Sequence, residues 1–159
     1  MTNRTDELKV LEQIQSAFPR GKKDILTHED CLRWRVDLPL LRYEDLPSIL
    51  GQLLEDLIRT RSGEPYGTES LDMVLLFLDV EVVGTDLSVL GEDRVKKFAE
   101  DASYLRKEGE EMATTFTLSQ AKAILAWLEL TREWPDTKYY LKVIDSASNF
   151  WRKRVTEQT

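Results

Sequence analysis

The stretch Asp45-Leu-Pro-Ser-Ile-Leu-Gly-Gln-Leu-Leu-Glu-Asp-Leu-Ile58 decides the fold class. Its apolar residues recur every three or four positions, which is the period of an α-helix with one buried face. Pro47 suits a first helical turn, and Ser62 with Gly63 ends the pattern. The stretch therefore predicts a helix with a broad apolar stripe. The stripe consists of Ile49, Leu50, Leu53, Leu54, Leu57 and Ile58.

The same period recurs along most of the chain on both sides of this stretch. Further helices are expected over residues 5–18, 28–38, 69–83, 92–108, 118–134 and 137–155. No linker rich in Pro, Gly or Ser divides the 159 residues, a length typical of one domain. We therefore predict an all-α, single-domain multi-helix bundle of about six or seven helices over residues 1–159, with frayed ends at 1–4 and 156–159.

Side chains that can accept hydrogen bonds from free backbone amides mark several helix starts. Thr117-Leu-Ser-Gln120 has the sequence of a capping box, and Thr27 precedes a further helix. Thr5 and Asp136 are predicted to cap the first and last helices.

Two of the predicted helices carry expectations about side chains or secondary structure. Residues 92–108 are expected to bury Val95, Phe98, Ala102 and Leu105. Residues 78–83 alternate apolar and acidic side chains, which is the pattern of a strand. A strand is therefore the alternative there to the favoured prediction, a helix that frays near Val80.

The numbers of cysteine and histidine residues and the length of the longest apolar run exclude several classes of protein. One cysteine, Cys31, cannot form an internal disulfide, and one histidine, His28, cannot complete a zinc finger or a histidine-rich metal site. The amino-terminal residues are polar, unlike a secretory signal. The longest apolar run, residues 73–78, is far shorter than the ~20 residues that span a bilayer. We predict a cytoplasmic protein with no membrane contact and no cofactor.

The acidic residues are concentrated in one part of the chain, residues 62–93, which we call the acidic segment. It holds eight acidic residues and no Lys, Arg or His, whereas the whole chain has 29 acidic and 22 basic residues and a net charge of −7. Such a concentration favours a positively charged partner. Glu92 and Asp93 suit the start of the next helix. The predicted partner-binding residues are Glu69, Asp72, Asp79, Glu81 and Asp86.

Other groups of reactive or charged residues have simpler explanations. Cys31 and His28 could form a nucleophile and its base, but the neighbouring acids disfavour a thiolate and suit a helix start. The basic run at residues 152–154 suits a helix end, so nucleic-acid binding is not expected of this acidic chain. No catalytic or metal-ligating set is predicted.

Parts of the chain resemble a bacterial family of small helical proteins of unknown function. The resemblance covers Phe116-Thr-Leu-Ser-Gln-Ala-Lys-Ala-Ile-Leu-Ala-Trp-Leu-Glu-Leu130, Phe150-Trp-Arg-Lys-Arg154 and Ala17-Phe18-Pro19. It implies a helical fold and a bacterial or phage origin, and it implies no activity.

Three functions follow from these observations as hypotheses. The favoured one is a non-enzymatic interaction module that binds and neutralises or regulates a basic protein partner, as an immunity protein or inhibitor does. The alternatives are an enzyme that uses acidic residues with a divalent metal, and a homodimeric subunit paired through the face from Ile49 to Ile58.

Overall fold

The computed structural model describes residues 4–18, 25–60, 70–80 and 92–158. Within the helix that begins at residue 92, the side chains of 92–95, 97–99, 101–103 and 105 lie outside this description. The predicted burial of Val95, Phe98, Ala102 and Leu105 therefore concerns side chains that are not described.

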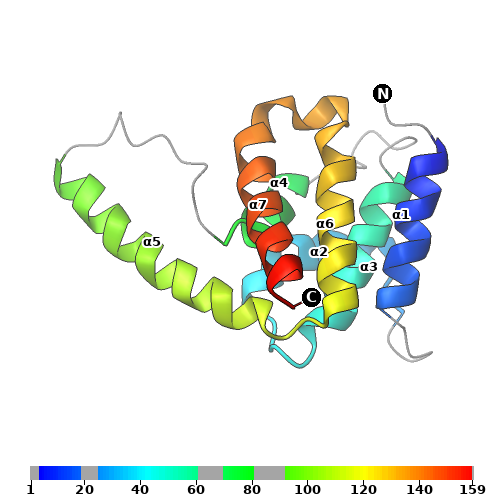
Figure 1. The fold of residues 1–159 in the computed structure, drawn as a ribbon, viewed down its shortest axis with the longest axis horizontal. Coiled ribbons are helices and arrows are strands. Elements are labelled where there is room, and N and C mark those ends of the chain that lie inside the picture. Colours follow the sequence, from blue (N-terminus) through cyan, green and yellow to red (C-terminus); the bar gives the residue numbers. More distant parts are fainter. Residues whose placement is uncertain (1–3, 19–24, 61–69, 81–91, 159) are drawn as a thin grey trace.

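The prediction of an all-α multi-helix bundle is confirmed, and the described residues contain no strand. The α-helices are α1 (Arg4–Ala17), α2 (His28–Asp37), α3 (Leu46–Thr60), α4 (Leu71–Leu78), α5 (Glu92–Ala113), α6 (Leu118–Arg132) and α7 (Leu141–Gln158). Two 3₁₀ helices, η1 (Leu38–Leu40) and η2 (Pro135–Tyr140), adjoin α2 and α7. Figure 1 shows α6 and α7 side by side, α1 next to α6, and α5 projecting away from the other helices.

The helix that decided the fold class, α3, lies in the centre of the core. Leu50, Leu53, Leu54 and Leu57 have no exposed surface, because α1 and α2 both pack on this helix. Gly51 permits close approach, since a Cβ there would lie 2.5 Å from the Cβ of Phe18. The face on which the homodimer alternative depended is thus covered within the same chain.

The hairpin of α6 and α7 forms the other half of the core. The predicted capping box begins α6: the Gln120 amide donates to Thr117 Oγ1 (3.2 Å), and the Thr117 amide donates to Gln120 Oε1 (3.0 Å). Trp127 packs edge-on against Trp134, with ring centroids 6.3 Å apart, and both side chains are buried. Thr27 caps α2 in the same way, with Asp30 as the reciprocal partner.

Several helix ends differ from the prediction. The segment from Pro135 to Tyr140 is a 3₁₀ helix, so Asp136 does not cap α7, which starts at Leu141. Thr5 lies inside α1, which already includes Arg4. The carboxyl end remains helical to Gln158, where fraying was expected.

The lengths of α4 and α5 also differ from the prediction. α4 ends at Leu78, two residues before Val80, where the predicted helix was expected to fray. Residues 81–83, for which a strand was the alternative, lie outside the described part. α5 continues to Ala113, five residues beyond Glu108. Of the described helices, none is long and apolar enough to cross a membrane.

Candidate functional site

The structure describes two of the five predicted partner-binding residues, Asp72 and Asp79. Glu69, Glu81 and Asp86 lie outside the described residues. Asp72 lies half-buried in the first turn of α4. Asp79 follows α4 and is only 4% exposed, with its carboxylate accepting a hydrogen bond from Ser146 Oγ of α7 (2.5 Å). Asp79 therefore joins α4 to α7 instead of facing solvent.

The helix that carries Asp72 has apolar side chains on two faces. One face of α4 belongs to the core and includes Val74, Leu75 and Leu78, which are fully buried. On the other face, Met73 is 38% exposed and Leu76 is 53% exposed. Asp72 is the only charged residue in this helix, so α4 cannot cover its second face with polar side chains.

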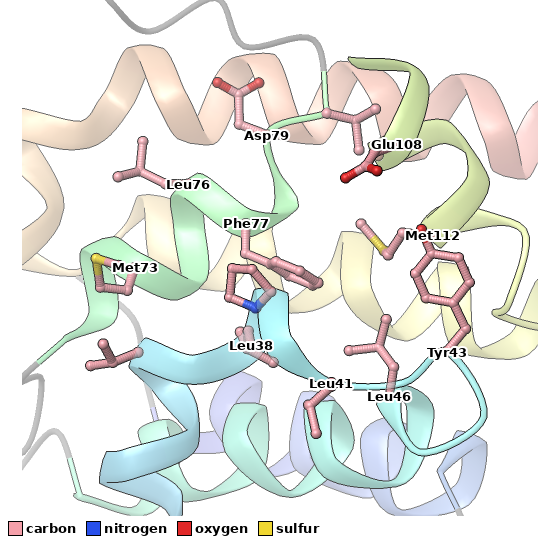
Figure 2. A pocket seen from close by; sticks show the side chains of 14 residues that line it. Leu38, Leu41, Tyr43, Leu46, Met73, Leu76, Phe77, Asp79, Glu108 and Met112 are labelled. Atoms are coloured by element: carbon pink, nitrogen blue, oxygen red, sulfur yellow. The ribbon is translucent and has the colours of Figure 1, made fainter. Parts of the chain in front are cut away.

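An apolar groove lies along this second face of α4. Val36 at the end of α2, with Leu38 and Pro39 of η1, forms the facing wall. The last two turns of α5 close one end with Glu108 and Met112. Together with α4 these segments enclose a cavity of about 390 Å³, which Figure 2 shows from close by. We call this cavity and its exposed rim the apolar groove.

Close packing between α5 and the segment after α4 shapes one edge of the groove. Gly109 faces Val80 so closely that an added Cβ would lie 2.9 Å from Val80 Cγ1, which is too near for ordinary contact. The absence of a side chain at Gly109 therefore lets the end of α5 pack against Val80, just after α4, at this edge of the cavity.

The charged side chains that line the groove are both acidic. They are Asp79 and Glu108, and no Lys, Arg or His among the described residues lines it. Glu108 Oε1 accepts a hydrogen bond from the Tyr104 hydroxyl (2.7 Å), which raises the pKa of Tyr104. Burial, with the neighbouring carboxylates of Glu108 and Glu111, raises the pKa of Tyr43 above its usual value. One end of the groove is thus negatively charged.

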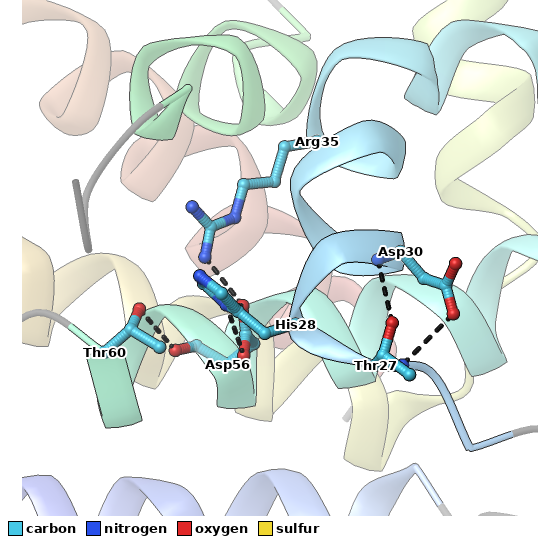
Figure 3. A network of polar contacts seen from close by, with 6 residues as sticks. All are labelled: Thr27, His28, Asp30, Arg35, Asp56 and Thr60. Carbon is cyan, nitrogen blue, oxygen red and sulfur yellow. Dashed lines mark hydrogen bonds and ion pairs between the residues drawn. The ribbon is translucent and has the colours of Figure 1, made fainter. Parts of the chain in front are cut away.

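A polar network beneath the groove holds α2 on α3 (Figure 3). Arg35, which is fully buried, donates from Nη2 to Asp56 Oδ2 (2.7 Å), and His28 Nδ1 lies 2.9 Å from the same oxygen. His28 is in the first turn of α2 and Arg35 is near its last turn. A single carboxylate of α3 therefore contacts both ends of α2, which positions Val36 and Leu38 in the groove wall.

The cysteine considered as a nucleophile lies in this same region. Cys31 is buried, and its burial together with the charge of Asp56 raises its pKa to about 12. The thiol therefore stays protonated near neutral pH, where a nucleophile would need to be a thiolate. His28 lies against Asp56, which gives it a structural contact.

Some residues of the groove were not recognised in the sequence as site residues. Val36 and the α4 residues Met73, Leu76 and Phe77 have the pattern of ordinary core residues. One signal could have found them: residues 71–78 are apolar except for one acid, which is more apolar surface than a helix with one buried face requires.

Neither a metal-binding cluster nor a similarity to known proteins assigns a chemistry to the site. Among the described residues, no group of three or more His, Cys, Asp or Glu side chains could hold a metal ion. Comparison with known protein families, with curated proteins and with solved structures finds no match. The resemblance seen in the sequence stays a prediction.

Proposed function

We propose that this protein is a non-enzymatic interaction module that binds and neutralises or regulates a basic protein partner, in the manner of an inhibitor or immunity protein. The proposal rests on one observation. The apolar groove leaves large apolar side chains exposed, and the charged side chains that line it, Asp79 and Glu108, are both acidic.

The apolar part of the groove supplies the affinity in this proposal. Met73 and Leu76 keep 38% and 53% of their surface exposed, and Val36 across the groove keeps 46%. Covering such surface is worth roughly 25 cal/mol per Å² of apolar area removed from water. Exposed apolar side chains gathered around a cavity are typical of a docking site, whereas single ones are common on any surface.

The acidic charges supply the selectivity and speed of association. A net charge of −7 attracts a positively charged protein over a distance, and the carboxylate of Glu108 at the groove favours a cation in the bound complex. The eight acidic residues of the acidic segment contribute to this long-range attraction. We expect the module to act in the cytoplasm, as the sequence predicted.

The experiment compares two variants in which an equally exposed leucine becomes lysine. Leu76→Lys places a positive charge in the groove, and Leu8→Lys is the matched control, because Leu8 is 51% exposed on α1, a helix that does not line the groove. Each immobilised protein is incubated with lysate. Any basic protein retained by wild type is then purified and titrated against all three proteins.

We expect the purified partner to bind wild type and Leu8→Lys with similar affinity, and Leu76→Lys at least about tenfold more weakly. Binding should also weaken between low salt and roughly 0.5 M NaCl, since exposed charges are screened. If every retained protein binds Leu76→Lys as tightly as wild type, the groove is not the docking site and the proposal is wrong.

A further inference from the structure

The groove has features that specify more than a positively charged partner. We infer that it recognises an apolar side chain with a Lys or Arg beside it in the partner's sequence, and that Glu108 is the residue that selects for the cation. This inference rests on the proposed function and names the chemistry of its contact. The occupant is therefore a segment of a protein.

The size and lining of the cavity indicate an apolar anchor. Its volume of about 390 Å³ is near the small end of the range for ligand pockets, roughly 300–1,000 Å³, so it has room for a side chain or two and not for a whole element. Met73 and Met112 stand on opposite sides, with Phe77 between them (Figure 2). Flexible thioether side chains adapt to anchors of different shape.

The position of Glu108 indicates where the cation lies. Glu108 comes from α5 at the end of the cavity that Tyr43 and Met112 also line, whereas Asp79 contacts Ser146 of α7 (Figure 2). Of the two carboxylates, Glu108 is therefore the one placed to meet a charge on a bound segment. Glu108 lines the same cavity as the apolar side chains, so the cation must be close to the anchor in the partner.

The Tyr104 hydroxyl orients this carboxylate. It donates to Glu108 Oε1 over 2.7 Å from one turn earlier in α5. The hydrogen bond occupies one oxygen of the carboxylate and leaves the other for a cation. Tyr104 does not line the cavity, so it is a positioning residue that acts through Glu108.

The chain contains a natural set of reporters for this test. It has three methionines, Met1, Met73 and Met112, of which the last two line the cavity. Protein labelled with ¹³C at the methionine methyl groups gives a spectrum of three signals, assigned with Met73→Leu and Met112→Leu. The probes are three blocked dipeptides, acetyl-Phe-Arg-amide, acetyl-Phe-citrulline-amide and acetyl-Phe-Glu-amide, titrated to millimolar concentration. Citrulline has nearly the shape of arginine without its charge.

We expect the arginine dipeptide to shift the Met73 and Met112 signals, with affinity about three- to tenfold above the citrulline dipeptide and higher still above the glutamate dipeptide. In Glu108→Gln the arginine and citrulline dipeptides should bind equally, whereas Glu110→Gln, an exposed acid on the same helix that does not line the groove, should keep the preference. Tyr104→Phe should weaken the arginine dipeptide alone.

Several outcomes would overturn the inference. One is equal binding of the arginine and citrulline dipeptides to wild type, and another is an unchanged preference in Glu108→Gln. A third is a shift of the Met73 and Met112 signals with protein concentration alone, since a second copy of the chain would then fill the groove. If the groove shows no preference for the arginine dipeptide while Leu76→Lys still weakens partner binding, this inference is refuted and the proposed function stands. If the groove prefers the arginine dipeptide but the partner binds Leu76→Lys as tightly as wild type, the proposed function is refuted and the preference of the groove stands.

Discussion

The helices α3 and α4 are both rich in leucine, yet their surroundings differ. α3 is covered on nearly all sides, and even its polar residues Gln52 and Glu55 are buried. Gln52 Oε1 accepts from the Leu26 amide (2.8 Å), and Glu55 Oε1 accepts from Gln15 Nε2 (2.8 Å). α4 is covered on one face only, and its second face is the wall of the apolar groove.

The difference shows that apolar composition alone does not determine which surface a helix buries. α3 has neighbours that satisfy its polar groups, so nearly all of its circumference can lie in the core. α4 has a higher proportion of leucine than α3 and leaves Met73 and Leu76 exposed. An apolar face that the fold leaves uncovered can serve as a binding site, and it adds nothing to the stability of the fold.

The largest expected effect comes from truncating a leucine on the covered face of either helix. Leu54→Ala in α3 and Leu75→Ala in α4 should each lower the free energy of unfolding by about 2–5 kcal/mol, because both side chains are fully buried and leave a cavity. Urea denaturation followed by circular dichroism at 222 nm measures the change. A loss below roughly 1 kcal/mol at Leu75 would show that α4 is not part of the core.

A smaller loss is expected where α1 approaches α3. Gly51→Ala adds a Cβ that would lie 2.5 Å from Phe18 Cβ, and relieving this overlap should cost about 1–3 kcal/mol, more than the ~1 kcal/mol that alanine gains in a helix. Thermal denaturation compares it with Gly109→Ala. At Gly109 the added Cβ would lie 2.9 Å from Val80 Cγ1, so Gly109→Ala should lower the free energy of unfolding less than Gly51→Ala does. Stabilisation by Gly51→Ala would mean that α1 packs differently.

The sequence predicted most of the fold because the patterns involved are local. The period of apolar residues in α3 and the capping box of α6 depend on neighbours three and four positions away, and the structure confirms both. Local spacing does not determine burial where distant packing decides which residues are covered. Leu8 has the spacing of a core residue in α1 and is 51% exposed, because α1 packs on α3 and α6 mainly through residues nearer its carboxyl end, such as Ile14.

The site was less predictable than the fold for the same reason. Negative charge in the acidic segment is visible in the sequence, but the burial of Asp79 depends on Ser146, which lies 67 residues away. Glu108 lies outside the acidic segment and lines the groove at the point where α5 packs against Val80 through Gly109. Such juxtapositions arise from tertiary packing, which no local pattern records.

Raising the pH is expected to lower the free energy of unfolding by about 1 kcal/mol through the buried thiol of Cys31. Burial raises the pKa of Cys31 to about 12 from its usual value of 9.0, so the folded state holds the thiol proton more tightly than the unfolded chain. The resulting stability is complete below pH 9 and is lost as pH rises from there toward 12. By pH 10 the loss should be about 1 kcal/mol.

The control for this pH effect is Cys31→Ala. Its melting temperature should start lower than that of wild type at pH 8, and the difference between the two should shrink at pH 10. Tyrosines whose pKa is raised titrate in both proteins, so their contribution cancels in the comparison. An undiminished difference at pH 10 would argue that the Cys31 thiol is not buried in the folded protein.

The smallest effect on stability is expected on the uncovered face of α4. Leu76 follows Leu75 directly, but it is 53% exposed, so Leu76→Ala should change the free energy of unfolding by about 0.5 kcal/mol or less. The same urea titration measures it, with Leu75→Ala as the matched neighbour. Equal losses at the two positions would mean that something in the same chain covers Leu76, and the groove would then not be open to a partner. A near-zero loss combined with weaker partner binding by Leu76→Ala would separate the two faces of α4, one serving stability and the other recognition.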